Sequence, residues 1–482
     1  MQRIKNFLFK NTSDKQTVAK NTFWLVSGEI IGRLFKLGIV VFATRQLGIE
    51  GWGIFSYALA FVSFFYILGD FGVNTFITRE MSKDTENKYK YLATSFIIKI
   101  SLLIILFTLS LLIGPHIGKI KLSLSLLTVF SLLFFSDSVR EFALSINRAL
   151  GKMEREAFSK ILMNSLITIL GIILVIKKAD PLSLAIAYLI GSAIATVFVL
   201  WSIRKEFTKI KWYFSKESLK IIYNFSWPII IISLFSFIFN IDSIMLGQLK
   251  SVADVGLYSA AQRIVQFTAI IPAFIAMSIF PILSKNESDD GRLANIFEKI
   301  MTIVFAIGIP LAIGGFLLST KIMFFVFGHE YVSGGLTLGI LMISILASFP
   351  NIILTNVIFS KNLQRTFIAA TSFGVLANIV LNLLLIPKYG ALGAAISVTA
   401  TQLLIMVINW QKLKKIIPFS IIPKIGRLVI SCLIMALVIL ILNTLGVHIL
   451  IIVTIAVATY TFSLYVLKEP SFNEILSLVK SQ

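Results

Sequence analysis

Apolar residues gather in long blocks along the chain, and short polar segments separate each block from the next. The blocks at 91–114, 181–203 and 421–442 contain few charged residues. A helix needs roughly 20 apolar residues to cross the hydrocarbon core of a bilayer. Because about fourteen blocks reach that length, the pattern predicts an all-α membrane protein with about fourteen transmembrane helices.

The predicted spans follow closely on one another, and glycine or proline residues mark turns between several of them. No polar segment between the spans is long enough to form a separate soluble domain. The expected ranges are 20–45, 52–78, 91–114, 122–147, 157–177, 181–203, 219–248, 254–284, 294–320, 333–360, 364–386, 390–411, 421–442 and 446–467.

Two segments, at 47–58 and 246–261, share a pattern of Leu-Gly followed by Gly, aromatic, serine and alanine residues. Each segment joins one predicted span to the next, so we expect two parallel lobes of six spans around a central cavity. The alternative is chance similarity between apolar segments. The expected organisation is a cytoplasmic N-terminus at 1–19, an N-lobe at 20–204, a cytoplasmic linker at 205–218, a C-lobe at 219–415, two added spans at 416–467 and a cytoplasmic tail at 468–482.

Basic residues outnumber acidic ones by 44 to 23, and they crowd into alternate loops. The segment at 204–220 holds six of them, whereas the loop between the fifth and sixth spans holds Lys177 and Lys178 only. The positive-inside rule places the basic loops in the cytoplasm. This distribution predicts a multi-pass protein of the cell (plasma or inner) membrane with both termini cytoplasmic, and it argues against a nucleic-acid partner.

The composition gives no support to an enzyme. Cys432 is the only cysteine and lies in an apolar span, which rules out an intrachain disulfide. The three histidines, His116, His329 and His448, are scattered without the spacing of metal ligands. The chain has no Walker A sequence and no Gly-x-Ser-x-Gly elbow. We therefore expect no catalytic residue, no metal and no cofactor.

Charged residues inside the predicted spans are the best candidates for function, since each costs roughly 2.5–3.5 kcal/mol at the centre of a membrane helix. In the first span, Glu29, Arg33 and Lys36 lie on one helical stripe. This stripe must face the protein interior or a water-filled cavity. The surplus of positive charge favours a cavity that accepts anions. The alternative is a structural Glu29–Arg33 pair with Lys36 extended to the interface.

The eighth span carries a second deep cation, Arg263, with Ser259 and Gln266 on the same face. Arg263 lies about ten residues, or ~15 Å, from the outer end of the span. The surrounding polar face favours a cavity-lining role. The alternative is a buried arginine satisfied by backbone carbonyls or by Asp242.

Other charges within the spans are candidates for structural ion pairs or for coupling. Asp137, Arg140 and Glu141 cluster on one side of the fourth span and nearly neutralise one another, which favours a structural cluster. Lys99 either extends to the cytoplasmic interface or joins this cluster.

Asp70 and Asp242 lie near the ends of their predicted spans. We expect each to be a helix cap or a partner for a nearby arginine, and titration in a transport cycle is the alternative.

Three longer motifs resemble one known family. They are Gly-Asp-Phe-Gly at 69–72 leading to Arg79 and Glu80, the run at 242–247 continuing into 255–263, and the Asn-Ile-Val-Leu-Asn motif at 378–382 followed by 386–396. The chain thereby resembles, over about 15–470, the polysaccharide biosynthesis membrane proteins. These form the flippase branch of the multidrug/oligosaccharidyl-lipid/polysaccharide exporter superfamily.

The resemblance implies two six-helix lobes around a cavity that opens alternately to each side of the membrane. It implies a polyprenyl-phosphate- or pyrophosphate-linked oligosaccharide as substrate, with Arg33 and Arg263 as the cations of the lumen. Lys36 and Gln266 would lie beside them, and Glu29 would partly neutralise the site.

We therefore expect a monomeric flippase for surface glycan assembly. Its partners would be the lipid-linked oligosaccharide, membrane lipids and glycan-assembly enzymes, and its energy source, H⁺, Na⁺ or glycan consumption outside, stays open. The alternatives are an ion-coupled exporter of drugs or metabolites, for which an acidic lumen would be expected, and a membrane scaffold that transports nothing.

Overall fold

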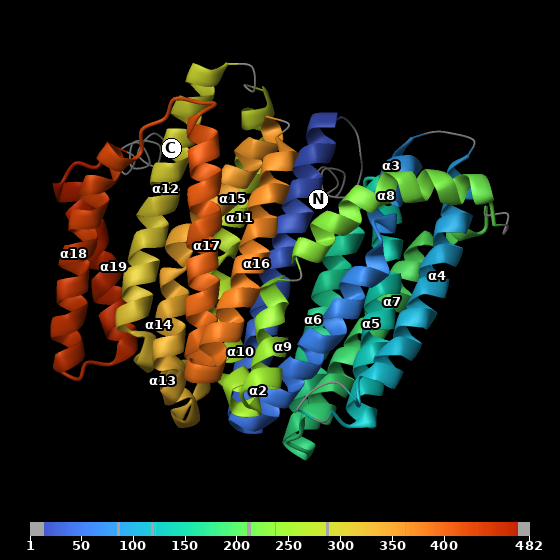
Figure 1. The fold of residues 1–482 in the computed structure, drawn as a ribbon, viewed down its shortest axis with the longest axis horizontal. Helices are drawn as coiled ribbons and strands as arrows, with labels where there is room; N and C mark the ends of the chain where they lie inside the picture. Colours follow the sequence, from blue (N-terminus) through green and yellow to red (C-terminus); the bar gives the residue numbers. More distant parts are fainter. Residues whose placement is uncertain are drawn as a thin grey trace, which may run out of the picture. The chain divides into compact units, whose positions relative to one another are not determined.

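The computed structural model describes residues 14–83, 87–116, 120, 122–209, 214–236, 238–285, 289–361 and 363–470. Over these ranges the chain is helical almost throughout and contains no strand (Figure 1). The expectation of an all-α protein is therefore confirmed.

The chain divides into two compact units, Met1–Gln248 and Leu249–Gln482. The helices of the first unit are α2 (Asp14–Asp70), α3 (Val73–Ser82), α4 (Lys88–Ile113), α5 (Leu124–Ala149), α6 (Met153–Lys177), α7 (Pro181–Phe207), α8 (Lys216–Ser236) and α9 (Ile238–Leu249).

The second unit begins with the two consecutive helices that replace the predicted span 254–284. Its elements are α10 (Val252–Thr268), α11 (Ile270–Lys285), α12 (Asp290–Leu317), α13 (Ser319–Phe327), the 3₁₀ helix η1 (His329–Gly334), α14 (Gly335–Ile343), α15 (Ile345–Ser360), α16 (Gln364–Tyr389), α17 (Ala391–Lys414), α18 (Ile422–Thr444) and α19 (Ile449–Val466).

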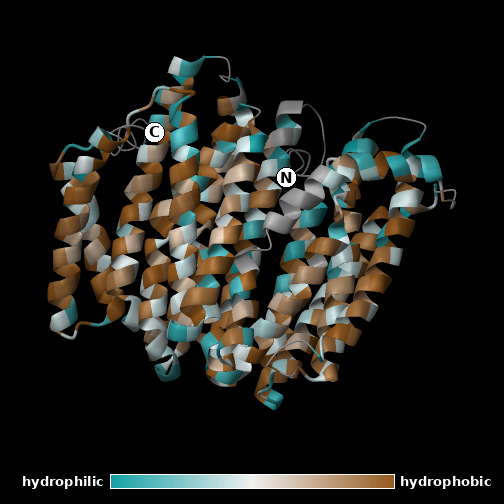
Figure 2. Ribbon diagram, in the orientation of Figure 1, coloured by the Kyte–Doolittle hydropathy of each residue, from teal (hydrophilic) through white to brown (hydrophobic). Residues whose placement is uncertain are grey.

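Many helices present apolar side chains outward, as membrane helices do. In the part of the chain that the structure describes, eleven segments are long and apolar enough to cross a membrane, the first of them Ala19–Ser82. Leu433 and Leu437 on α18 are 60% and 59% exposed, which suits a lipid environment and would be unfavourable in water. Figure 2 shows hydrophobic residues along the helices and hydrophilic ones in the connecting segments. The chain is a multi-pass membrane protein, and the number fourteen stays a prediction.

Two backbone breaks divide the N-terminal helical region. Gly48 has φ 66° and ψ −177°, which kinks α2 at the turn predicted between the first two spans. The second predicted span, 52–78, is wrong as a continuous helix, because α2 ends at Asp70 and α3 begins at Val73. Between them, Phe71 and Gly72 have φ values of 48° and 69°. A non-glycine residue with positive φ is uncommon, so Phe71 marks a specific bend.

Two other predicted spans are also interrupted. The span 254–284 breaks between α10 and α11, where Pro272 has no N–H to donate to the carbonyl of Thr268. The span 333–360 breaks at Ser344, between α14 and α15. Residue 237 of the predicted span 219–248 lies outside the described residues, and α8 contacts α2, α3 and α4 of the first unit.

Close packing of α2 against α6 brings the charged residues of the first span next to the fifth span. A Cβ added to Gly28 would lie 2.7 Å from the Cα of Ala157, and one added to Gly171 would lie 2.6 Å from Cδ1 of Ile39. Small residues allow membrane helices to approach this closely. Since Gly28 is at the contact, its neighbour Glu29 lies within reach of polar side chains on α6.

In the second unit, α18 and α19 form a hairpin that packs against α12. Ile309 of α12 belongs to one apolar cluster with Leu428 of α18 and Ile452 of α19. Buried Glu298 of α12 accepts hydrogen bonds from the backbone N–H of Ser420 and from Lys424. The last two predicted spans therefore attach to the second unit by apolar packing and by one buried carboxylate.

Candidate substrate-binding site

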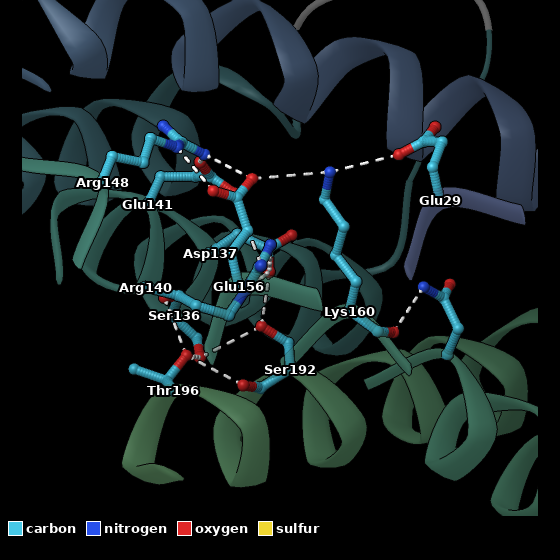
Figure 3. A network of polar contacts seen from close by, with 11 residues as sticks. Glu29, Ser136, Asp137, Arg140, Glu141, Arg148, Glu156, Lys160, Ser192 and Thr196 are labelled. Carbon is cyan, nitrogen blue, oxygen red and sulfur yellow. Dashed lines mark hydrogen bonds and ion pairs between the residues drawn. The ribbon is translucent and has the colours of Figure 1, made fainter. Parts of the chain in front are cut away.

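A chain of ion pairs of alternating sign runs through the first unit, and Figure 3 shows the part of it from Glu29 to Asp137. Its members come from α2, α5 and α6, and they comprise equal numbers of cations and carboxylates. In order of contact they are Arg33, Glu29, Lys160, Glu156, Arg148, Glu141, Arg140 and Asp137. We call this set the charge chain.

Glu29 holds two cations from different helices. Its Oε1 accepts from Nε of Arg33 on the same helix at 2.6 Å, and its Oε2 accepts from Nζ of Lys160 on α6 at 3.1 Å. The side chains of Arg33, Glu29 and Lys160 are 34%, 30% and 30% exposed. The Glu29–Arg33 pair, which the sequence analysis gave as the alternative, is present, and the structure adds Lys160 as a second partner of Glu29.

Arg148 connects the middle of the charge chain. Its Nε and Nη2 donate to the two oxygens of Glu156 at 2.7 and 2.9 Å, which is the two-pronged geometry that arginine forms with carboxylates. Nη2 also donates to Oε2 of Glu141 at 3.1 Å. Lys160 lies 3.6 Å from Oε1 of Glu156, so Glu156 joins Arg148 to Lys160.

Asp137, Arg140 and Glu141 lie together on α5, as the sequence predicted. The Nη2 atom of Arg140 is 3.3 Å from Oδ1 of Asp137, and its Nη1 is 3.4 Å from Oε1 of Glu141. The same Asp137 oxygen accepts from the hydroxyl of Ser192 on α7 at 2.6 Å. Arg140 is only 5% exposed, and this burial with two carboxylates favours a structural role.

Lys99 pairs with Asp70 and also interacts electrostatically with Glu141 of the predicted cluster. Its side chain is 2% exposed, and its Nζ lies 3.5 Å from Oδ1 of Asp70. The expectation that Lys99 reaches the interface is therefore wrong, because the side chain is enclosed by protein. Asp70, at the end of α2, forms its ion pair with Lys99 on α4. Its basic partner is therefore a lysine and not the arginine that we expected.

In the second unit, Arg263 is partly exposed and its Nη1 donates to Oε1 of Gln266, one turn further along α10, at 3.2 Å. Ser259 is buried instead and donates to the carbonyl of Gly256. Asp242 is buried on α9 of the first unit, and Lys36 is exposed on α2. The cavity that Arg33 and Arg263 are expected to line together, and the alternative contact of Arg263 with Asp242, would each join the two units and stay predictions.

Sequence reasoning missed three members of the charge chain: Arg148, Glu156 and Lys160. Arg148 and Lys160 lie near the ends of their spans, where basic residues indicate topology. One signal was available, because Glu156 and Lys160 are four residues apart and so share a helical face.

The fold is that of a known class of membrane transporters. The chain superposes on a solved structure entitled "Lipid II flippase MurJ, inward closed conformation" with a TM-score of 0.79 and 19% identity, covering 92% of this chain and 98% of that one. An inward-facing multidrug resistance MATE family transporter of the MOP superfamily gives a TM-score of 0.63 and 15% identity, with 81% and 98% covered. These likenesses define the fold.

The sequence then identifies the family. The family described as "Polysaccharide biosynthesis protein" matches residues 18–287, more than half of the chain, and the chain belongs to it. The MatE family matches residues 228–384. A relative from Haloferax volcanii named "Probable low-salt glycan biosynthesis flippase Agl15" is 24% identical over 96% of this chain and 99% of its own length. The family resemblance seen in the motifs is confirmed.

Proposed function

We propose that this protein is a flippase that moves a polyprenyl-phosphate- or pyrophosphate-linked oligosaccharide from the inner to the outer leaflet. The observation that carries the proposal is Arg33, a guanidinium that is one-third exposed within the apolar helix α2. Family membership and the names of the relatives support the same substrate class.

A phosphate group needs a cation along its path, because an ionised group transferred unpaired into hydrocarbon loses its hydration. Arginine suits phosphate, since its planar fork donates two parallel charge-assisted hydrogen bonds. Arg33 of the first unit and Arg263 of the second are the residues we propose for this contact. Lys36, exposed on α2, would add positive charge near Arg33.

We propose that the glycan crosses in a hydrated lumen while the polyprenyl tail remains in lipid. The two lobes would alternate between inward- and outward-open arrangements, as transporters built from parallel repeats do. An H⁺ or Na⁺ gradient, or removal of the glycan at the outer side, would drive the cycle.

The proposal is tested by reconstituting the full-length protein in vesicles that contain a fluorescent polyprenyl-pyrophosphate-linked oligosaccharide. A membrane-impermeant reductant quenches only the outer leaflet, so flipping exposes the inner pool. We expect Arg33→Ala and Arg263→Ala each to slow flipping by at least about tenfold, which corresponds to the loss of one charge-assisted contact.

Lys178→Gln provides the matched control, since Lys178 is 75% exposed and pairs with Asp180 outside the spans. It should flip lipid at the wild-type rate. Wild-type rates in both arginine variants, with equal amounts of reconstituted protein, would reject the proposed phosphate contact.

An ion-coupled exporter of drugs or metabolites is the second candidate, because the MatE family matches residues 228–384. Organic cations would favour carboxylates at the binding surface, whereas Arg33 and Arg263 are cations. Efflux of cationic dyes by wild-type protein in a pump-deficient host, combined with no lipid flipping, would favour this candidate.

A further inference from the structure

The carboxylate of Glu29 bridges two cations, with one oxygen for each. Nε of Arg33 donates to Oε1 at 2.6 Å, and Nζ of Lys160 donates to Oε2 at 3.1 Å. Because the two contacts use different oxygens, one can be lost while the other stays intact. Glu29 therefore occupies one donor of the residue that the proposed function assigns to phosphate binding.

We propose that Glu29 is an exchangeable internal counter-ion: it occupies Nε of Arg33 until a phosphate or pyrophosphate group displaces it, and Lys160 then keeps the carboxylate paired. This inference rests on the proposed function, since it takes Arg33 as the anion-binding residue. It assigns Lys160 as a positioning residue that acts through Glu29.

Lys160 determines how much free energy is lost when a phosphate group displaces Glu29 from Arg33. A carboxylate left unpaired between two membrane helices is strongly unfavourable, whereas one that retains a lysine is not. Lys160 is itself fixed by Glu156, whose Oε1 lies 3.6 Å away, and Glu156 is held by two hydrogen bonds from Arg148. Loss of the Arg33 contact therefore leaves the lysine in place beside Glu29.

Exposure along the charge chain is consistent with exchange at this position. Both members of the Arg33–Glu29 pair are partly exposed, at 34% and 30%, whereas Arg148 and Asp137, at 30% and 28%, pair with the buried side chains of Glu156 and Arg140, at 5% and 6%. A ligand can approach the Arg33–Glu29 pair without unpacking the helices. At the buried pairs, exchange would require separation of α5 from its neighbours.

The exchange gives the site selectivity for multivalent anions. A tethered carboxylate at Arg33 competes with any incoming anion, and a small monovalent anion gains little by replacing one charge-assisted hydrogen bond with another. A pyrophosphate carries more charge and more acceptor oxygens, so it can displace the carboxylate. The internal counter-ion also favours release, because it returns to Arg33 when the ligand leaves.

The test measures binding of farnesyl diphosphate to the purified full-length protein in detergent by titration calorimetry. Glu29→Gln should lower the Kd by about two- to fivefold, the range that a partly exposed ion pair supports, and Lys160→Gln should raise it by a similar factor. In the double variant, the effect of Lys160→Gln should disappear, because no carboxylate remains to be stabilised.

The double variant separates exchange from a general effect of charge. If Lys160 acted only by adding positive potential, Lys160→Gln would raise the Kd by the same factor with and without Glu29. Lys160→Arg should retain wild-type affinity, and Lys178→Gln, which removes a lysine without touching Glu29, should also retain it. Chloride should compete with farnesyl diphosphate more effectively in Glu29→Gln than in the wild type.

Failure of the inference differs from failure of the proposed function. Wild-type binding that depends on Arg33 but is unchanged by Glu29→Gln would overturn the counter-ion role alone. Equal effects of Lys160→Gln in both backgrounds would do the same. No binding of farnesyl diphosphate to the wild type, or binding unaffected by Arg33→Gln, would overturn both.

Discussion

Replacing Arg148 by methionine removes the guanidinium at the middle of the charge chain and keeps an unbranched side chain. The wild-type contacts are two hydrogen bonds to Glu156, at 2.7 and 2.9 Å, and one to Glu141 at 3.1 Å. Glu156 is only 5% exposed, so its charge would be left with Lys160 at 3.6 Å. Breaking a buried pair costs roughly 3–5 kcal/mol. Since Arg148 is 30% exposed, we expect the lower end, about 3 kcal/mol.

The assay is chemical unfolding of the full-length protein in detergent, followed by far-ultraviolet circular dichroism. Arg148→Met should lower the midpoint strongly, and Arg148→Met combined with Glu156→Gln should recover most of the loss, because the uncompensated charge is gone. Arg204→Met is the matched control. Arg204 is exposed on α7 and stacks on Trp201, 4.4 Å from the ring centre, without a carboxylate in that contact.

Two results would refute this reasoning. Wild-type stability of Arg148→Met would mean that water or other groups compensate Glu156. A double variant no more stable than Arg148→Met would mean that the loss comes from packing and not from the buried charge.

Two further predictions concern single positions outside the charge chain. Gly390→Ala should destabilise the protein by about 1–3 kcal/mol, because Gly390 has φ 57° and an added Cβ would lie 2.1 Å from a carboxylate oxygen of Asp254. The control is Gly426→Ala, where no atom lies within 4 Å of the added Cβ, and it should show no loss of thermal stability. Burial raises the pKa of Asp180, but hydrogen bonds from Lys178 and from the N-terminus of α7 outweigh it and hold that pKa below its usual value. The stabilisation from Asp180 should therefore be present at neutral pH and be lost as the pH falls through the pKa of the folded protein, and Asp180→Asn should flatten this acid limb of the unfolding midpoint.

The membrane helices could be predicted because the bilayer imposes one length and one composition on every span. Helix α7 begins at Pro181 and α16 begins at Gln364, at the predicted positions. The breaks at Phe71, Ala269 and Ser344 were not predicted. They leave the apolar character of the sequence unchanged, so a pattern based on hydropathy does not register them.

The charge chain was predictable only where its members share a helix. Glu29 and Arg33 are four residues apart, and helical geometry alone places them together. Lys160 is 131 residues from Glu29 in sequence, and its contact depends on the close packing of Gly28 against Ala157. Sequence reasoning considered only a pair within one helix as the alternative to a cavity, whereas packing gives Glu29 cationic partners on two helices.

The sharing of carboxylates between cations explains how the eight members of the charge chain are accommodated among apolar helices. An isolated pair would leave carboxylate lone pairs and guanidinium hydrogens unsatisfied, and burying it would cost more than the attraction returns. In the charge chain, Glu29, Glu156 and Glu141 each contact two cations, so the desolvation cost is spread over many contacts. Exposure then differs along the chain, with Arg33 at 34% and Arg140 at 6%. The buried part holds the helices in register, and the exposed part can change partners, which is why the phosphate contact is expected at Arg33.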